Sequence, residues 1–553
     1  MVNTEPDYFA VAWRSAKPIN GSRTQSHREE VMIGMHRSTA FLDRRASPSF
    51  VVGVIAVTIG VLLHLPMLMI SGGADLNLSG MAIDGKMVAG MALIVVGVAV
   101  AAYGLLPRDL ARQRTAAHAI VIMPPEDAPL TRAHWRLMIV LVVALVIDVM
   151  KPAALGFTIP GMIAEYHASK ATVSLVPLSA LTGTVVGSIL WGAIADLYGR
   201  KASILLSAVM FVGTSICGAM PSLGWNIAMC FMMGAAAGGM LPVTYALLAE
   251  MMPSRHRGWS LVLVGGLGAA GGYFAASGSS AFLQPIFGWR VLWLLNLPTG
   301  LALVLLGGFI PESAKFLIAS GRVAEAEQVM ALFGSKAGPS IVRGSAAEPT
   351  IALSGRAFVG KLVALSLAAI CYGLTNFGLL LWLPTDLFAK GYSMAMSSKL
   401  LAMSALIAFP TVFIVAFVYS RWSTKGSVLS ALALTIAGLL GVLRLEFGGG
   451  GGPVLPVALL IVGTNALIAM LLPYTAESFP LRIRARTTGI VAACSKAGGM
   501  FAQCLAVLAL VPPLALVALA IILPSAIALG LVALFGKETR GRDLRDLDHS
   551  VLA

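Results

Sequence analysis

Apolar runs of about twenty residues recur along the whole chain, separated by short polar segments. A helix of that length crosses the hydrocarbon core of a bilayer and satisfies its own backbone polar groups there. Of the 553 residues, 58% are hydrophobic and 12% are charged, whereas soluble domains carry about 25% charged residues. The sequence therefore predicts an all-α membrane protein with about fourteen spans.

The net charge of +14 is distributed unevenly among the loops. Arginine and lysine concentrate in alternate loops, at Arg44, Arg45, Arg108, Arg112, Arg114, Arg200, Lys201, Arg255, Arg257, Arg482, Arg484 and Arg486. This pattern follows the positive-inside rule and predicts that both termini are cytoplasmic. Because the cations follow membrane topology, we do not expect nucleic acid as a partner. We expect a multi-pass protein embedded in the lipid bilayer of a bacterial cytoplasmic membrane.

The apolar and polar stretches divide the chain into seven segments. They are a cytoplasmic tail (1–48), an extra two-helix hairpin (49–106), a cytoplasmic linker (107–135), a first half of the core (136–311), a cytoplasmic segment between the halves (312–356), a second half (357–536) and a cytoplasmic tail (537–553).

The two halves of the core carry the same motifs. AEMMPSRHRG (249–258) returns as AESFPLRIRA (476–485), which places Glu250 and Glu477 227 positions apart. A second pair of motifs places Glu312 and Glu538 226 positions apart. Two motifs with nearly the same offset indicate an internal duplication. An even number of spans in each half makes the repeats parallel, with a binding site near the midplane between them.

The segment GAIADLYGRK (192–201) lies in the loop after the second span of the first half. Gly192 and Gly199 are expected to allow a close backbone approach and a tight turn. Asp196 can pair with Arg200 and form a latch at the cytoplasmic end.

This segment resembles the loop signature of the major facilitator superfamily, with Lys201 at its end and Leu197 in place of the usual base. PESAKFL (311–317), KETRGRDL (537–544) and the repeated blocks resemble intracellular motifs of the sugar-porter branch and its organic-ion and aromatic-acid relatives. The resemblance covers residues 136–545. It implies two parallel halves of six helices each and an inner gate made of charged residues: Glu250, Arg257, Glu312, Glu477, Arg484 and Glu538. The alternative is that these residues are loop charges set only by topology.

The first span of the core, VLVVALVIDVMKPAALGFTIPGM (140–162), carries two charges. Asp148 and Lys151 are three positions apart and share a helix face, and Pro152 leaves the carbonyl group of Asp148 without its helical donor. The stretch resembles the D-G-[FY]-D motif of aromatic-acid–proton symporters, with lysine in place of the second acid. From the burial of these charges we expect Asp148 to carry the coupled proton and Lys151 to bind the carboxylate of an anionic substrate. The alternative is a closed ion pair that only holds helices together.

Further polar residues in apolar spans are candidates for the same site. Tyr372, Thr375, Asn376, Asn465 and Lys496 are predicted to bind substrate, and Tyr474 and Gln503 are weaker candidates. Lys496 could instead pack against Glu477. The glycine cluster GAAGG (268–272) is expected to serve close helix packing.

The resemblance implies a secondary transporter of a small organic solute. We expect a carboxylate metabolite, moved by alternating access and coupled to protons. The seventh core span lacks the glutamine-rich signature of sugar porters, which argues against a hexose. An exporter of amphipathic compounds, or a sensor or lipid-handling protein that does not transport, remains an alternative. The sequence has no nucleotide loop, catalytic triad or metal cluster, so we expect neither enzymatic activity nor a cofactor.

Overall fold

A computed structural model describes residues 46–66, 78–106, 120–123, 129–319, 322–334, 336–339, 356–448, 452–479, 481–510 and 513–540. Thirteen helices in these ranges are long and apolar enough to cross a membrane, and Pro48–Leu62 is a shorter apolar helix. The predicted all-α membrane fold with about fourteen spans is thereby confirmed. The tail predicted at 1–48 lies almost wholly outside the described residues, as do much of the two cytoplasmic segments and most of the tail at 537–553.

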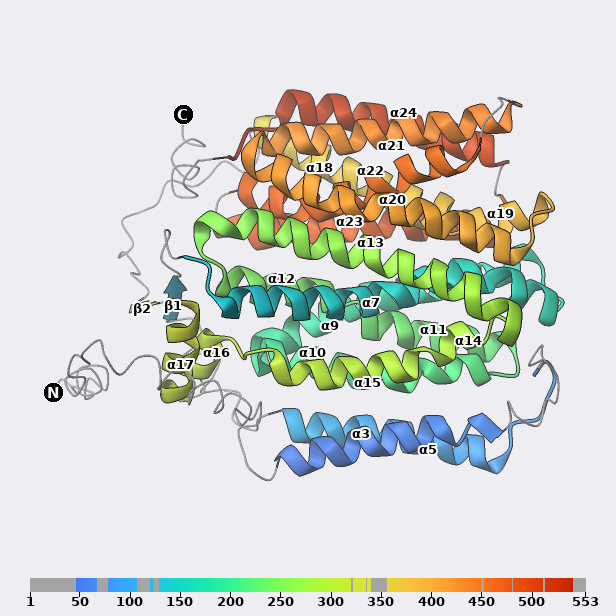
Figure 1. Cartoon of the computed structure of the whole chain (residues 1–553), viewed down its shortest axis with the longest axis horizontal. Helices are drawn as coiled ribbons and strands as arrows, with labels where there is room; N and C mark the ends of the chain where they lie inside the picture. Colours follow the sequence, from blue (N-terminus) through green and yellow to red (C-terminus); the bar gives the residue numbers. More distant parts are fainter. Residues whose placement is uncertain are drawn as a thin grey trace. The chain divides into compact units, whose positions relative to one another are not determined.

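The helices follow the predicted order (Figure 1). The hairpin consists of α3 (Ala46–Leu62) and α5 (Gly85–Leu105). The N-terminal half consists of α7 (Arg132–Glu165), α8 (Lys170–Val173), α9 (Leu175–Tyr198), α10 (Arg200–Gly213), the 3-10 helix η1 (Thr214–Ala219), α11 (Leu223–Ala237), α12 (Met240–Met251), α13 (Ser254–Phe287), α14 (Val291–Leu294), α15 (Asn296–Leu306) and the 3-10 helix η2 (Gly307–Phe309). The C-terminal half consists of α18 (Arg356–Gly373), the π-helix η3 (Leu374–Leu380), α19 (Leu383–Ala389), α20 (Met394–Arg421), α21 (Thr424–Glu446), α22 (Val454–Ser478), α23 (Leu481–Val507) and α24 (Leu514–Phe535).

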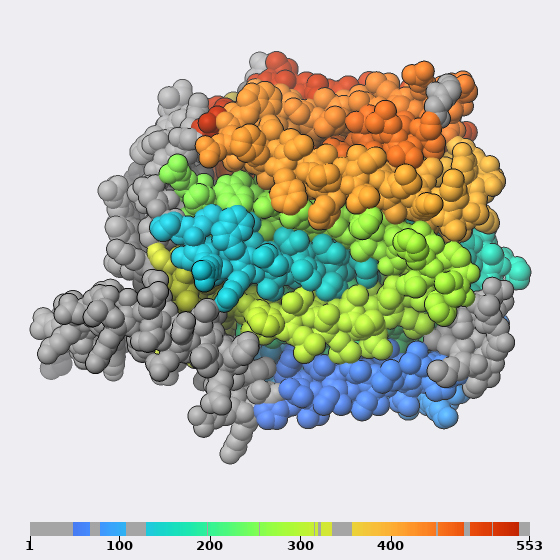
Figure 2. All heavy atoms as spheres, in the orientation of Figure 1, coloured from blue at the N-terminus to red at the C-terminus, as the bar shows by residue number. Residues whose placement is uncertain are grey.

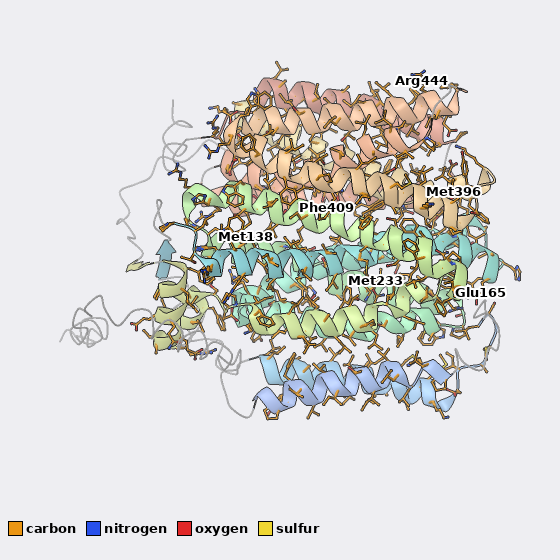
Figure 3. All side chains as sticks on the ribbon, in the orientation of Figure 1. Met138, Glu165, Met233, Met396, Phe409 and Arg444 are labelled. Atoms are coloured by element: carbon orange, nitrogen blue, oxygen red, sulfur yellow. The ribbon has the colours of Figure 1, made fainter. Side chains whose placement is uncertain are left out.

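We call the end of the bundle where α7, α10 and α13 begin the inner end, which the charge pattern predicts to be cytoplasmic; it lies on the left in Figure 1. The opposite end is the outer end. Met138 lies near the inner end of α7 and Glu165 at the outer end (Figure 3). Helices α16 (Ala314–Ala319) and α17 (Val323–Phe333) lie beyond the inner end.

Two short strands depart from the purely helical expectation. β1 (Ile120–Met123) and β2 (Lys336–Pro339) form an antiparallel pair in which Ile120 is opposite Pro339. Their pairing joins the linker at 107–135 to the segment between the halves at 312–356.

The extra hairpin is held together by glycines. A Cβ atom at Gly53 would lie 2.6 Å from the carbonyl oxygen of Gly97, and one at Gly60 would lie 2.7 Å from that of Gly90. The two backbones can approach this closely only because these positions lack side chains.

The hairpin packs against α10, beside the N-terminal half (blue in Figure 2). The span that begins with α10 is 94% buried, whereas the span of its repeat counterpart α21 is 39% buried. The hairpin therefore covers a helix whose counterpart in the other half lacks such a cover.

The two halves meet through a small set of helices. α13 packs along α20 and α22, α7 contacts α19, and α9 contacts α23. Within the halves, α7 packs along α13, and α18 packs along α23 and α24. Residues on α7, α13, α18, α22 and α23 are therefore placed to form a site between the halves, as the parallel repeat predicts.

Candidate transport site

Asp148 is buried in the middle of α7. Only 5% of the residue is exposed, and its Oδ1 atom has no hydrogen-bond partner in the described part of the structure. The glycines of α13 pack directly on this stretch of α7, since a Cβ atom at Gly272 would lie 2.6 Å from the Cβ atom of Val149. The expected packing role of the glycine cluster is therefore confirmed. A buried carboxyl oxygen without a partner is costly, which favours a functional role for Asp148.

Lys151 is turned into the N-terminal half. Its ammonium group donates to the carbonyl oxygen of Phe211 (2.9 Å) and to the hydroxyl group of Thr214, and it lies 3.9 Å from the centre of the Phe211 ring. Because α10 ends at Gly213, carbonyl groups of its last turn are free to accept hydrogen bonds at the negative end of the helix dipole. The described structure thus shows no direct Asp148–Lys151 ion pair, which was the alternative reading of these two charges. The role of Lys151 in substrate binding stays a prediction.

Lys496, on α23 of the C-terminal half, lies close enough to interact electrostatically with Asp148, as does Lys151. In turn, Asp148 is the charged group that acts on Lys496. The Lys496 ammonium lies 5.1 Å from the centre of the Phe377 ring, and no direct ion pair joins it to Asp148 in the described structure. Both readings of Lys496, as a binding cation and as a packing partner of Glu477, therefore stay predictions. A carboxyl group of one half and a cation of the other half thus lie near each other.

The irregular segment η3 lies in the first helix of the C-terminal half. Applying the 227-residue offset, its residues Leu374–Leu380 correspond to positions 147–153, which include Asp148 and Pro152. α7 itself is a continuous α-helix at these positions, so the irregular turn is confined to the C-terminal half, and π-helical turns are frequent at functional sites. Thr375 and Asn376 lie on this segment.

The other predicted binding residues are placed differently. Tyr372 is buried, and its ring meets Phe377 edge-on at 6.3 Å. Thr375 donates its hydroxyl group to the carbonyl oxygen of Cys371 (2.8 Å), and Asn376 is half-buried. Asn465 is 9% exposed, and its Nδ2 atom has no partner among the described residues.

Two weaker candidates have structural contacts instead. Tyr474 donates to the carbonyl oxygen of Lys537 (2.7 Å), outside the spans. Gln503 accepts from Trp382 (3.2 Å) and donates to the carbonyl oxygen of Phe377. The expectation that Tyr474 lines the central site is therefore wrong.

Two tyrosines near the site were missed by sequence reasoning. The hydroxyl oxygen of Tyr245 on α12 would lie 1.7 Å from a Cβ atom at Gly265, so this glycine makes room for the phenol. Tyr273 directly follows the glycine cluster, and its hydroxyl group has no hydrogen-bond partner in the described structure. That position next to the cluster is the one sequence signal that could have indicated Tyr273.

The inner end of the N-terminal half carries the predicted motif residues. Arg200 pairs with Glu250 at 3.1 Å. Oε1 of Glu312 accepts from the backbone N–H groups of Arg200 (2.9 Å) and Lys201 (3.3 Å), at the start of α10. Burial raises the pKa of Glu312 despite these hydrogen bonds. Ser313 donates to Glu250 (2.6 Å), so the two glutamates form one network.

The two motif glycines differ. Gly199 has a φ of 97°, a conformation that favours glycine, and a Cβ atom there would lie 2.5 Å from Glu312. At Gly192 a Cβ atom would have nothing within 4 Å. The expected close approach is therefore present at Gly199 and wrong for Gly192. The side chain of Asp196 lies outside the described structure, as does that of Arg484.

The C-terminal half has a corresponding network at its inner end, in which hydroxyl groups donate to the glutamates. Glu538 accepts from the backbone N–H group of Thr424 (2.9 Å) at the start of α21, as Glu312 does at the start of α10. Glu477 accepts from the hydroxyl groups of Tyr419 (2.8 Å) and Thr539 (2.9 Å). Burial opposes the charge of Glu538, but hydrogen bonds from Ser423 and Thr424 outweigh it and lower its pKa to about 2.

Glu477 also reaches the N-terminal half. A Cβ atom at Gly258 on α13 would lie 3.2 Å from its Oε1 atom. Arg257 lies near enough to both Glu477 and Glu250 to interact with them electrostatically. This is the geometry expected of a contact that joins the halves at the inner end, and the gate role of these residues stays a prediction.

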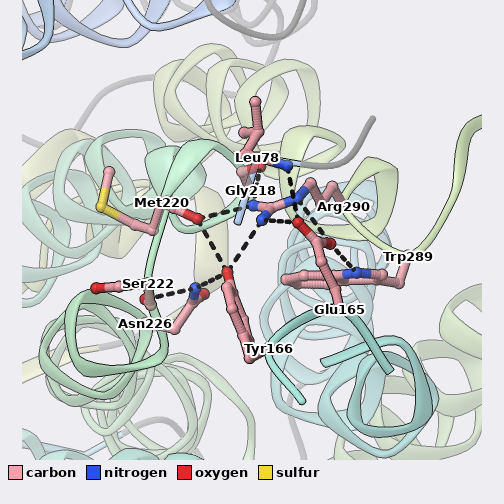
Figure 4. A network of polar contacts seen from close by, with 9 residues as sticks. All are labelled: Leu78, Glu165, Tyr166, Gly218, Met220, Ser222, Asn226, Trp289 and Arg290. Atoms are coloured by element: carbon pink, nitrogen blue, oxygen red, sulfur yellow. Dashed lines mark hydrogen bonds and ion pairs between the residues drawn. The ribbon is translucent and has the colours of Figure 1, made fainter. Parts of the chain in front are cut away.

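A third polar network lies at the outer end of the N-terminal half (Figure 4). Arg290 is fully buried and pairs with Glu165 at 2.6 Å, and it also donates to the carbonyl oxygens of Gly218 and Met220. Leu78 donates its backbone N–H group to Glu165 (2.8 Å), which ties the hairpin to the core.

The model of the family described as the Major Facilitator Superfamily matches residues 138–503. Over 392 residues the chain is 25% identical to the niacin transporter NiaP of Acinetobacter baylyi, covering 68% of this chain and 87% of that protein. It is 31% identical over 284 residues to the 4-hydroxybenzoate transporter PcaK of Pseudomonas putida, covering 48% of this chain and 62% of that one. The fold is similar to that of the proton:xylose symporter XylE bound to 6-bromo-6-deoxy-D-glucose, with a TM-score of 0.60, 16% identity, and coverage of 75% of this chain and 98% of that one.

Proposed function

The chain belongs to the major facilitator superfamily, and from this membership we propose that it transports a small aromatic carboxylate by proton-coupled alternating access. Similarity to transporters named for niacin and for 4-hydroxybenzoate supports the substrate class, because both compounds are aromatic rings that carry a carboxyl group. The sequence argument against a hexose agrees with this choice.

The observation that carries the proposal is the position of Asp148. It is buried, and one of its oxygens has no partner in the described structure. Of the two cations near it, Lys151 is hydrogen-bonded at the end of α10, and Lys496 belongs to the other half. A carboxyl group in this state can take up a proton without breaking a hydrogen bond.

Substrate binding and proton uptake are then coupled through Lys496. A substrate carboxylate that binds Lys496 withdraws that cation from Asp148, and the uncompensated Asp148 takes up a proton. Both negative charges at the site are thereby neutralised before the halves move, which avoids carrying unpaired charge through a low-dielectric region. When the substrate and the proton leave, the Asp148–Lys496 interaction is restored. Lys496 is the proposed binding cation and Asp148 the proposed proton carrier.

We further propose that the inner-end networks around Glu250 and Glu477 hold the halves together when the site is closed to the cytoplasm. The contact of Glu477 with Gly258 of α13 supports this role. The membrane is proposed to be a bacterial cytoplasmic membrane, with both termini on the cytoplasmic side, as the charge pattern predicts.

The substrate class is tested by the thermal stability of the purified protein with panels of ligands, because a ligand that binds the native state stabilises it by mass action. Niacin and 4-hydroxybenzoate should raise the midpoint, whereas xylose and amphipathic cations should not. Stabilisation by amphipathic cations without any effect of carboxylates would refute the proposal and favour an exporter.

A further inference from the structure

Tyr273 and Asn465 present buried polar atoms that nothing in the described structure satisfies. These atoms are the hydroxyl oxygen of Tyr273 on α13 and the Nδ2 atom of Asn465 on α22. Leaving a buried donor without a partner costs about 1–3 kcal/mol. Such groups in a native protein call for an explanation, and a bound ligand is one.

The face of α13 that carries Tyr273 looks toward the C-terminal half. Gly266 and Ser280 lie seven residues before and after Tyr273, which is close to two helical turns in each direction. A Cβ atom at Gly266 would lie 2.5 Å from Val412 on α20 and 3.6 Å from Ala469 on α22. The hydroxyl oxygen of Ser280 lies 2.8 Å from that of Ser398 on α20. Since residues on both sides of it touch the other half, Tyr273 also faces the boundary between the halves.

Asn465 faces the same boundary from the opposite side. It precedes Ala469 by four residues, so the two share a face of α22, and Ala469 is the residue that meets Gly266. α13 and α22 run in opposite directions, because Gly258 meets Glu477 and Gly266 meets Ala469. Asn465 and Tyr273 therefore lie on the same side of the Gly266–Ala469 contact, toward the outer end.

The level of Tyr273 relative to Asp148 follows from the contact between α13 and α7. A Cβ atom at Gly272 would contact Val149 and the backbone nitrogen of Met150, so Asp148 lies beside residues 270–271 of α13. At about 1.5 Å per residue, Tyr273 lies roughly 4 Å nearer the outer end than Asp148. The ring of Phe157, with its centre 6.1 Å from that of Tyr273, supplies an apolar wall there.

We propose that Tyr273 is a specificity-determining residue that binds a second polar group on the aromatic ring of the substrate, on the side away from the carboxylate. This inference rests on the proposed function. The carboxylate interacts with Lys496 at the level of Asp148, the ring lies along Phe157, and the Tyr273 hydroxyl group meets a ring hydroxyl group or ring nitrogen. Asn465 adds a donor beside the ring. The site therefore prefers 4-hydroxybenzoate to benzoate, because benzoate leaves the tyrosine unpaired.

The experiment measures the dissociation constants of 4-hydroxybenzoate and benzoate by calorimetry on the full-length protein, as wild type and as Tyr273→Phe. The wild type should bind 4-hydroxybenzoate at least tenfold more tightly than benzoate. Tyr273→Phe should weaken 4-hydroxybenzoate to the level of benzoate and leave benzoate unchanged. Since the variant removes only an unpartnered oxygen, its melting temperature should not fall. Tyr392→Phe is the matched control, because Tyr392 is 38% exposed and lies outside the site; it should behave like wild type.

The other outcomes would refute either the role of Tyr273 or the proposed function. Equal binding of the two acids by the wild type, or an equal loss of both in Tyr273→Phe, would overturn the role of Tyr273 and leave the proposed function standing. If the wild type bound neither these acids nor niacin, the proposed function itself would fail, and this inference with it.

Discussion

Replacing Arg290 with methionine should destabilise the protein by about 4 kcal/mol, because the change leaves a buried carboxylate without its cation. Breaking a buried ion pair from one side costs roughly 3–5 kcal/mol. Here the value should lie near the lower limit for the pair itself, since Glu165 keeps two neutral donors, the backbone N–H group of Leu78 and the indole N–H group of Trp289, each at 2.8 Å. The carbonyl group of Gly218 loses a donor as well, which adds about 1 kcal/mol.

The carbonyl group of Met220 should be affected less. It still accepts from the hydroxyl group of Tyr166 at 2.9 Å. Burial raises the pKa of Tyr166 to about 12, so this phenol remains a neutral donor throughout the accessible pH range. The double variant Glu165→Gln/Arg290→Met removes both charges and should recover all but about 1–2 kcal/mol, as replacements of whole buried pairs do.

The assay is a double-mutant cycle on the free energy of unfolding, measured by denaturant titration of the purified protein. Arg444→Met is the matched control, because Arg444 is an exposed arginine at the outer end (Figure 3); it should change stability by less than about 0.5 kcal/mol. If the two single changes were additive in the double variant, the pair would not be coupled and the reasoning would be refuted.

Three further predictions follow from the site and the inner end. Lys151→Met should lower stability but leave the affinity for 4-hydroxybenzoate within about twofold. Lys496→Met should lower that affinity more than tenfold, or about 1.4 kcal/mol. If calorimetry gave the reverse order, Lys151 would be the binding cation. Gly265→Ala should lower the free energy of unfolding by about 1–3 kcal/mol, because its Cβ atom would overlap the Tyr245 hydroxyl group. Gly192→Ala should be neutral or slightly stabilising, because the added Cβ atom meets open space. Similar melting temperatures for the two variants would contradict this. Because the pKa of Glu538 is lowered in the folded protein, its charge stabilises the fold at pH values above the ordinary pKa of 4.5, and this contribution is lost as the pH falls toward 2. Glu538→Gln should therefore flatten the acid side of the profile of stability against pH. An unchanged profile would count against the hydrogen bonds at Thr424.

The duplicated fold could be predicted because its signals are local or periodic. Apolar run lengths give the spans, and the motif offset gives the repeat. The offset also predicted that Glu312 and Glu538 are equivalent, and both accept backbone N–H groups at the start of the third helix of their half.

Side-chain directions could not be predicted in the same way. The sequence placed Lys151 on the face of Asp148, but its ammonium group binds at the end of α10, about sixty residues away, because that helix happens to end at Gly213. The sequence does not show that Tyr273 faces the other half, because the orientation of α13 follows only from the contacts of Gly266 and Ser280. The hydrogen bond from Tyr419 to Glu477 likewise joins residues 58 positions apart, and the motif offset does not predict it.

The central claim is that Asp148 couples proton movement to carboxylate movement, and uptake into proteoliposomes tests it most directly. With an inward proton gradient, the wild type should accumulate labelled 4-hydroxybenzoate above its external concentration. Asp148→Asn resembles a permanently protonated site, so it should still exchange internal for external substrate but should accumulate none in response to the gradient. Accumulation by Asp148→Asn at the wild-type rate and level would contradict the account.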